Sequence, residues 1–176
     1  FENRAGDHHD GMEWFGLDAQ GKPSRSANLR GVIAMNHEAT TDEKLSSFFI
    51  HANGGTDVLR WEEVAVGDPG PGEARVRHTA IGVNYIDTYH RSGLYKLPLP
   101  SGLGAEAAGI VEAVGSGVEW VKPGDRVAYC GGPLGAYSEV RVIPADRLVK
   151  LPEGIAERVA ATLMLKGLTV QYLFRQ

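Results

Sequence analysis

The sequence has little cysteine and little charge excess: its 176 residues include one cysteine, Cys130, and the net charge is −4. One cysteine excludes a disulfide within the chain and a zinc site built from several cysteines. Lys and Arg are scattered, so no basic patch for nucleic acid is expected. No apolar run approaches the length that crosses a bilayer, and no signal peptide is visible at the N-terminus. We therefore expect a cytoplasmic protein without nucleic-acid or membrane partners.

The sequence also has no strand followed by G-x-G-x-x-G and a helix, the element that holds a dinucleotide pyrophosphate. Instead, short strands separated by turns begin near residue 57. In the segment 74–83, polar and apolar residues alternate, as in a strand with one buried face. Further strands are expected over 58–64, 109–114, 126–129, 137–143 and 147–150. Many short strands at close spacing predict a mainly β, α+β fold with a partly open barrel.

Two helices are expected beside these strands. One covers 85–91 and ends before Gly93, and the other runs from near Ile155 to the C-terminus with apolar residues at four-residue spacing. Residues 1–45 are polar and turn-rich, with one strand-like stretch at 32–35, so we expect an irregular N-terminal segment. The sequence thus divides into a poorly structured segment 1–55, a barrel 56–150 and a linking helix 151–176.

Several ordered blocks carry a resemblance to known proteins. They include AIGVNYIDTYHRSGLY at 80–95 and LKGLTVQY at 165–172, with further blocks at 103–111, 114–118, 122–129 and 134–139. Together they resemble the first domain of the zinc-independent medium-chain reductases, in the branch of the NADPH:quinone oxidoreductases related to zeta-crystallin. The resemblance implies a GroES-like barrel with a linking helix at its end. It also implies that the chain is a fragment, truncated before the Rossmann domain that holds the cofactor.

The resemblance implies a function for the complete enzyme. It would use NADPH, transfer hydride from the nicotinamide to a quinone or another small electrophile, and act as a homodimer, whereas the truncated chain alone is expected to be inactive. No catalytic side chain is assigned, because the cofactor itself carries the hydride. The alternatives are a zinc-free enoyl or alkenal reductase, a non-catalytic barrel that acts as an interaction module, and a metal-dependent phosphatase fragment.

The resemblance also implies site residues. The expected cofactor contacts are Asn84, Tyr85, Lys166, Thr169 and Tyr172, and the expected substrate contacts are Asn84, Asp87, Tyr89 and Tyr95. Asn84 lies between a strand and a helix, so it also fits as the cap of that helix, and both roles stay open. Asp87 has a structural alternative as well. Lys166, Thr169 and Tyr172 are spaced to share a broad sector of a helix.

The first segment carries a second resemblance. DGMEWF at 10–15 and VIAMNHEAT at 32–40 are similar to part of the PhoX-type alkaline phosphatases, where an Asn-His-Glu stretch belongs to the metal-binding region. By this resemblance Glu38 is the candidate ligand. A hard cation takes about six or more oxygen ligands, which one carboxylate does not supply, so no metal ligand is assigned. The chain is interpreted as a chimera, joined near residues 51–56.

We predict that the protein does not hold zinc tightly. In zinc-dependent relatives of these reductases, a Cys stands where this chain has Asn84 and a His where it has Ala105, and only the acid that follows, Glu106, persists. We interpret Glu106 as a structural hydrogen-bond acceptor. An alanine has no donor atom, and an amide is a poor zinc ligand beside thiolate or imidazole. Elemental analysis of protein purified without chelators should therefore find little zinc. A stoichiometric ion that survives dialysis would contradict this and would direct attention to His8, His9, His37 and Glu38.

Overall fold

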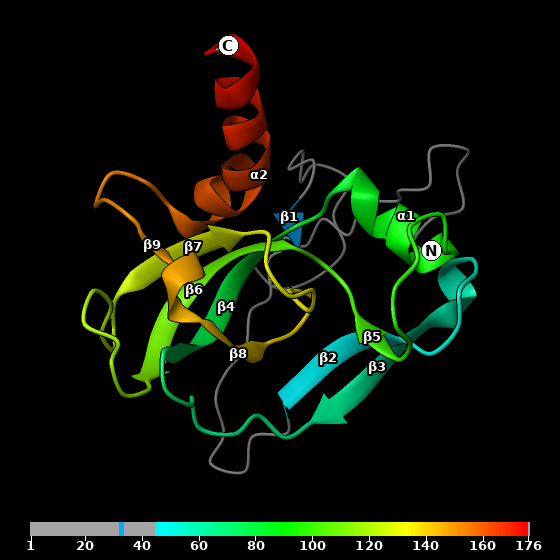
Figure 1. Cartoon of the computed structure of the whole chain (residues 1–176), viewed down its shortest axis with the longest axis horizontal. Helices are drawn as coiled ribbons and strands as arrows, with labels where there is room; N and C mark the ends of the chain where they lie inside the picture. Colours follow the sequence, from blue (N-terminus) through cyan, green and yellow to red (C-terminus); the bar gives the residue numbers. More distant parts are fainter. Residues whose placement is uncertain (1–31, 34–44, 176) are drawn as a thin grey trace, which may run out of the picture.

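The computed structural model describes residues 32–33 and 45–175, which form two antiparallel sheets and two α-helices (Figure 1). The larger sheet has the order β1-β4-β6-β7-β9, with β8 also paired to β4, and the smaller has the order β3-β2-β5. The larger sheet contains β1 (Val32–Ile33), β4 (Glu73–Gly82), β6 (Glu106–Val114), β7 (Arg126–Cys130), β8 (Val140–Pro144) and β9 (Val149–Lys150). The smaller contains β2 (Leu45–Ile50), β3 (Leu59–Val64) and β5 (Ser101–Gly102). The mainly β, α+β prediction is confirmed.

Two of these strands, β2 and β5, were not expected from the sequence. β2 pairs with β3 from Leu45↔Val64 to Ile50↔Leu59, and an isolated bridge joins Ser47 to Ser138. Residues 45–50 lie inside the segment 1–55 and belong to a sheet. Glu38 and most of the phosphatase-like stretches lie outside the described residues, and the division of the chain at residue 55 stays a prediction.

The alternation expected in β4 places its apolar side chains in the core. Ala74, Val76, His78 and Ala80 are buried, while the residues between them are half-buried. β4 is paired with β6 along most of its length and with β8 over its first half, so both of its hydrogen-bonding edges are occupied there. The main core is built from Ala74, Val76, Ile81, Ala107, Val111, Val121, Val127, Tyr129, Ala136, Ile143, Ala145 and Leu148.

A buried polar network is embedded in this core. His78 Nδ1 lies 2.6 Å from the carbonyl oxygen of Ser138, and the Tyr129 hydroxyl lies 2.8 Å from His78 Nε2. Because a carbonyl only accepts, Nδ1 carries the proton, and Nε2 accepts the hydroxyl hydrogen of Tyr129. Burial lowers the pKa of His78 to about 4 and raises the pKa of Tyr129 to about 12, so the network is neutral at pH 7.

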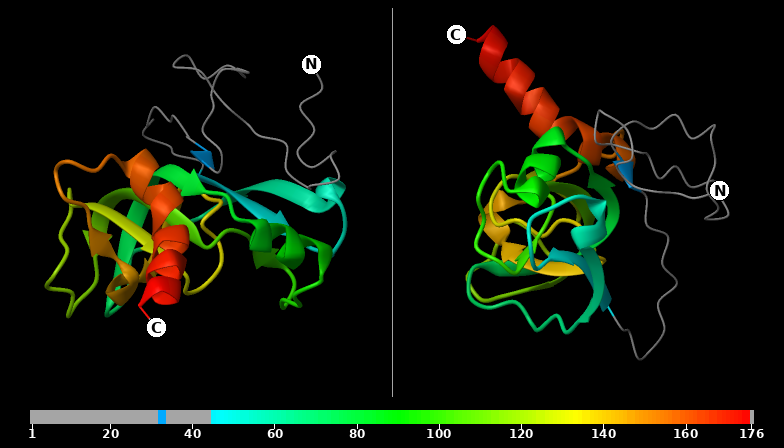
Figure 2. Two further views of the ribbon diagram at one scale, coloured as in Figure 1. Left: turned by 90° about the horizontal axis from the view of Figure 1, so that it is seen from above. Right: turned by 90° about the vertical axis from the view of Figure 1, so that its right-hand side faces the viewer.

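The two helices differ in how they attach to the barrel. α1 (Tyr85–Ser92) begins directly after β4 and Asn84, and it ends at Gly93 in the left-handed conformation. α2 (Glu157–Phe174) is attached by its first turns, where Ala160 and Ala161 pack against Ala80, Ala108 and Ala128. Its later turns extend away from the sheets and expose large apolar side chains (Figures 1 and 2). No helix in the described part of the chain is long and apolar enough to span a membrane.

Gly82, at the end of β4, permits the close approach of α2. A Cβ atom there would lie 2.1 Å from the carbonyl oxygen of Ala161 and 2.7 Å from Glu106 Oε2. Both distances are far below van der Waals contact, and one of the atoms belongs to the helix backbone. Glycine at this position is therefore a condition for seating α2 on the sheet.

We predict that His78 makes the protein acid-sensitive. The folded state holds the imidazole neutral down to a pKa of about 4, compared with 6.5 for the free group. Its contribution is therefore complete above pH 6.5 and is lost as the pH falls toward 4, because the unfolded chain is protonated first. A difference of this size corresponds to about 3 kcal/mol in the free energy of unfolding. Urea unfolding at pH 7.5 and pH 4.5 measures it.

The variants for this test are His78→Gln and, as a control, His51→Gln. His51 is exposed and contacts only the Glu62 side chain, which is also partly exposed, at 2.6 Å. Such exposed pairs contribute little, so its replacement should leave most of the acid-induced loss of stability in place. The His78→Gln variant should be less stable than the parent protein at pH 7.5, but its free energy of unfolding should fall less between pH 7.5 and pH 4.5. An equal pH dependence in both variants would refute this account of His78.

We predict that Gly82→Ala destabilises the fold, because the new methyl group collides with Ala161 and Glu106. Overpacking of this kind costs about 1–3 kcal/mol in the free energy of unfolding. Gly67→Ala is the matched control, since a Cβ there meets no atom within 4 Å. Thermal or urea unfolding of the two variants measures the difference. Equal stabilities would show that α2 can shift without cost.

Candidate functional site

Asn84 lies where β4 ends and α1 begins, as the sequence predicted. It is the N-cap residue of α1, in extended conformation, and only 6% of its surface is exposed. The carboxylate of Asp87 accepts a hydrogen bond from the Asn84 backbone N–H at 2.9 Å. The start of the helix is thereby fixed, as in a capping box. The Asn84 side chain points instead toward Glu106 and Lys166.

A buried carboxylate, Glu106 at the start of β6, joins Asn84 to α2. The Asn84 amide nitrogen donates to Glu106 Oε2 at 2.8 Å, and the Lys166 ammonium donates to the same oxygen at 3.0 Å. The Leu165 backbone N–H donates to Glu106 Oε1 at 2.7 Å. Lys166 also donates to Asn84 Oδ1 at 2.7 Å, so the three side chains form a closed cluster. We call Asn84, Glu106 and Lys166 the polar cluster.

The orientation of the Asn84 amide follows from these partners. An ammonium only donates and a carboxylate only accepts, so Oδ1 must face Lys166 and Nδ2 must face Glu106. Glu106 is fully buried, and Lys166 supplies the positive charge beside it, with its side chain 47% exposed. Lys166 is therefore the member of the cluster that a ligand in solution can reach most easily.

Asp87 sits behind this cluster in a second buried pair. The Tyr137 hydroxyl donates to Asp87 Oδ2 at 2.7 Å. Burial raises the pKa of Asp87, and burial together with the Asp87 charge raises the pKa of Tyr137 well above its usual value. The Tyr137 proton is therefore held in the hydrogen bond over the physiological range. This pair fixes α1 against the loop that precedes β8.

Three tyrosines predicted for the site form a row along α1 and the turn after it. The rings of Tyr85 and Tyr89 pack edge to face with centroids 5.1 Å apart, and those of Tyr89 and Tyr95 with centroids 5.4 Å apart. These distances are typical of stabilising aromatic pairs. Tyr85 and Tyr95 are each about half exposed, so the row presents aromatic surface to solvent beginning one residue after Asn84. We call it the tyrosine row.

The other predicted residues lie farther along α2. Thr169 is exposed, and its hydroxyl donates to the Leu165 carbonyl oxygen at 2.8 Å. Tyr172 is 66% exposed on the part of α2 that extends from the barrel. The structure thus brings Asn84 and Lys166 into contact, whereas neither Thr169 nor Tyr172 has a hydrogen bond to the polar cluster. Whether these residues bind a cofactor stays a prediction.

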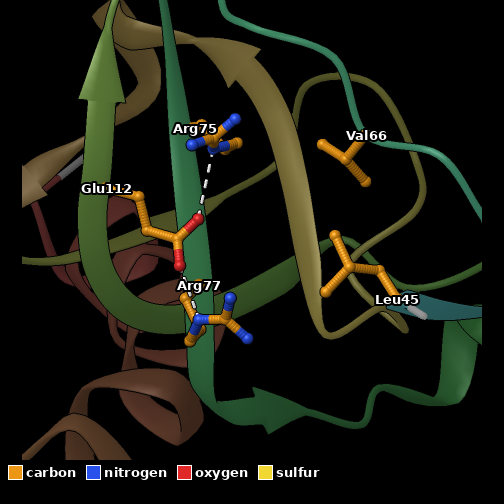
Figure 3. A pocket seen from close by; sticks show the side chains of 5 residues that line it. All are labelled: Leu45, Val66, Arg75, Arg77 and Glu112. Atoms are coloured by element: carbon orange, nitrogen blue, oxygen red, sulfur yellow. Dashed lines mark hydrogen bonds and ion pairs between the residues drawn. The ribbon is translucent and has the colours of Figure 1, made fainter. Parts of the chain in front are cut away.

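A shallow pocket elsewhere on the barrel contains none of the predicted site residues. In Figure 3 the Glu112 carboxylate lies between Arg75 and Arg77, with Leu45 and Val66 opposite them. Arg75 Nε and Arg77 Nε donate to the two Glu112 oxygens at 3.2 and 2.5 Å. Arg75 also pairs with the exposed Asp68 carboxylate at 3.1 Å, so two carboxylates balance the two guanidinium groups on this face of β4 and β6. Among residues 32–33 and 45–175, no three His, Cys, Asp or Glu side chains are grouped to hold a metal ion.

The sequence analysis did not predict Tyr137 as a residue of this region, and it did not predict the partners of Glu106. Tyr137, the partner of Asp87, was expected only as the start of a strand. Glu106 was interpreted as a structural hydrogen-bond acceptor, and the structure shows that it is one, although its partners were unknown. The available signal was a charged residue within the apolar stretch 103–111, since charges are rarely buried without a partner.

Comparisons with known proteins agree with this geometry. Residues 70–153 match the family model of the alcohol dehydrogenase GroES-like domain. A quinone oxidoreductase of Pseudomonas aeruginosa is 61% identical over 126 residues, which cover 71% of this chain and 39% of that protein. A 2-haloacrylate reductase of Burkholderia is 52% identical over 134 residues, which cover 72% of this chain and 40% of that protein. The chain thus spans about two fifths of these relatives.

A solved structure gives the same result. The crystal structure of Escherichia coli quinone oxidoreductase in complex with NADPH superposes with a TM-score of 0.73 at 53% sequence identity. The match covers 74% of this chain and 40% of that one. Together with the two open sheets and the C-terminal helix, these matches show that the barrel described here has the fold of the GroES-like domain of the quinone oxidoreductases.

Proposed function

We propose that this chain is the substrate-side part of an NADPH-dependent quinone oxidoreductase. The main support is the arrangement of the polar cluster, which joins the barrel to α2, beside the tyrosine row. Two of the relatives that share this region are named quinone oxidoreductases, and the Escherichia coli quinone oxidoreductase is solved with NADPH. When bound, the cofactor supplies a hydride. The protein's own residues bind the acceptor, orient it and provide polar partners for its oxygens.

The tyrosine row suits a flat, partly apolar acceptor. Quinones are planar, and aromatic side chains bind such rings by stacking or edge contacts. Tyr85 and Tyr95 expose about half of their surface, so they are accessible without rearrangement. In this proposal Tyr85, Tyr89 and Tyr95 contact the acceptor ring, while Asn84 and Lys166 lie at its polar end. Asp87, buried and bonded to Tyr137, positions α1 rather than touching the acceptor.

The residues present also fit one end of a nicotinamide cofactor. A carboxamide offers a donor and an acceptor, and the exposed side chain of Thr169 lies near the start of the free part of α2, about one turn beyond Lys166. The pyrophosphate has no G-x-G-x-x-G loop in this sequence to bind to. Contacts at one end of the cofactor do not offset the entropy lost on association. In this proposal the chain therefore needs a cofactor-binding partner domain for turnover.

A second acceptor class has specific support. The 2-haloacrylate reductase that is 52% identical over this region is named for an activated alkene. Quinones and such alkenes share a conjugated system with an oxygen acceptor, but a quinone presents a neutral carbonyl to the polar cluster and a haloacrylate presents a carboxylate. The acceptor preference is therefore part of the test.

We predict that a hybrid protein tests this function directly. Residues 45–175 replace the matching region of Escherichia coli quinone oxidoreductase 1, which is 55% identical to this chain over 127 residues. The hybrid should bind NADPH and oxidise it with 1,4-naphthoquinone. Comparing this turnover with that on 2-chloroacrylate shows which of the two acceptors the hybrid prefers. The chain alone serves as the inactive control. A folded hybrid that binds NADPH but reduces neither acceptor would refute the proposal.

Within the hybrid, Asn84→Ala should lower turnover more than Asp87→Ala. Asn84 belongs to the polar cluster, and its loss also removes partners of Lys166 and Glu106. Asp87→Ala should act mainly on stability, because it leaves the Tyr137 hydroxyl and the Asn84 N–H without an acceptor. Measuring kcat, KM and the urea midpoint of each variant separates the two effects. Equal loss of kcat at equal stability would count against this assignment.

A further inference from the structure

Lys166 has a hydrogen-bonding capacity that the fold does not use. An ammonium group carries three N–H donors. Two of them go to Asn84 Oδ1 at 2.7 Å and to Glu106 Oε2 at 3.0 Å. The lysine side chain is 47% exposed, and among the described residues the ammonium group has no hydrogen bond besides these two.

The other two members of the polar cluster are covered. Glu106 is fully buried and Asn84 is 6% exposed, and both are already bonded to each other and to Lys166. An acceptor bound at the cluster therefore meets the ammonium group first. Asn84 and Glu106 are placed to hold that group in position rather than to touch the acceptor.

The charge balance indicates which kind of oxygen the cluster suits. The positive charge of Lys166 is offset by Glu106 at 3.0 Å, so the pair attracts a resident anion only weakly. A neutral carbonyl oxygen does not need a net positive charge to bind, because it needs only an N–H donor. During reduction it gains negative charge, and a fixed N–H donor then stabilises it more than it stabilised the starting carbonyl.

We propose that Lys166 is the catalytic acid of the site, with a conjugated carbonyl compound as its substrate class; this rests on the proposed function. The hydride adds to a carbon of the conjugated system, and the electron pair of the carbonyl π system moves onto the oxygen. That oxygen takes the proton from the third N–H of Lys166, whose nitrogen keeps the electron pair. A proton from the solvent then restores the ammonium group, so the net change is the addition of one hydride and one proton to the acceptor.

Glu106 and Asn84 act in this step as positioning residues. Together with the Leu165 N–H, they fix the last turn of α2 that touches the barrel, and so fix where the lysine side chain starts. Removing Lys166 alone would leave Glu106 buried without its counter-charge, which is strongly destabilising. A second variant is needed to separate that effect from the loss of a proton donor.

The experiment uses the hybrid protein and two matched pairs of substitutions. Lys166→Met with Glu106→Gln removes the ammonium and the buried charge together. Lys150→Met with Asp125→Asn is the control, because Lys150 is 50% exposed and bonded to the Asp125 carboxylate at 2.8 Å on another part of the barrel. We expect the first pair to lower kcat with naphthoquinone by on the order of 100-fold or more, the usual range for a general acid. NADPH affinity should change less than about threefold, and the control should stay within about twofold of the parent, since exposed ion pairs contribute little.

Chemical rescue distinguishes proton donation from a structural role. In the hybrid carrying Lys166→Ala with Glu106→Gln, which leaves no buried charge unpaired, ethylammonium should restore kcat by about tenfold or more, since it replaces the missing acid. A variant impaired only in its fold would not respond. A Lys166→Met/Glu106→Gln variant that keeps the parent kcat, or a folded Lys166→Ala/Glu106→Gln variant that ethylammonium does not restore, would overturn the role of Lys166. A parent hybrid that binds NADPH but reduces no conjugated carbonyl would overturn the proposed function, and this role with it.

Discussion

The burial of the Glu106 carboxylate is the constraint on which the arrangement of the site depends. A carboxylate removed from water costs several kcal/mol unless its oxygens are bonded and its charge is compensated. Here the three donors are the Asn84 amide, the Lys166 ammonium and the Leu165 N–H, which come from the end of β4 and from α2. The burial of Glu106 thus requires that the end of β4 and α2 meet at the start of β6. Gly82 makes the meeting possible by leaving no side chain in the way.

From Glu106 the polar contacts continue to the other side of α1. The Asn84 backbone N–H is bonded to Asp87, and Asp87 is bonded to Tyr137, which precedes β8. The chain of contacts therefore joins three regions far apart in the sequence: the start of α1, the loop before β8 and the linking helix. Tyr85 and Tyr89 lie on the same helix, so buried hydrogen bonds set their position relative to Lys166. Tyr95 lies in the turn after the helix and packs on Tyr89.

The sequence predicted the fold well where a simple pattern existed. Alternation identified β4, and glycine after a helical segment correctly ended α1. β2 was missed because LSSFFI does not alternate: Ser46 and Ser47 are both buried and find partners in Glu139 and Tyr137. β5 has two residues, too few for any periodic pattern. Such strands are fixed by their neighbours in space and leave little local signal.

The site was predicted less completely, because its contacts link residues distant in the sequence. Asn84 and Lys166 are 82 positions apart, and helix spacing grouped Lys166 with Thr169 and Tyr172 instead. The spacing of residues along a helix predicts which of them share a face, but it does not predict where the helix stops packing against the barrel. The resemblance to a family named the residues, and only the structure showed that Glu106 joins two of them while Tyr137 holds a third.

The interface between α2 and the larger sheet determines which substitutions the protein tolerates there. The buried side chains that meet there are all alanines: Ala80, Ala108, Ala128, Ala160 and Ala161. In most cores the harmful change is the loss of methyl groups, because it opens a cavity. Here the side chains are already nearly as small as possible, so the harmful direction is growth. At these five positions random mutagenesis should therefore accept glycine or serine more often than valine or leucine, even though every position is buried and apolar.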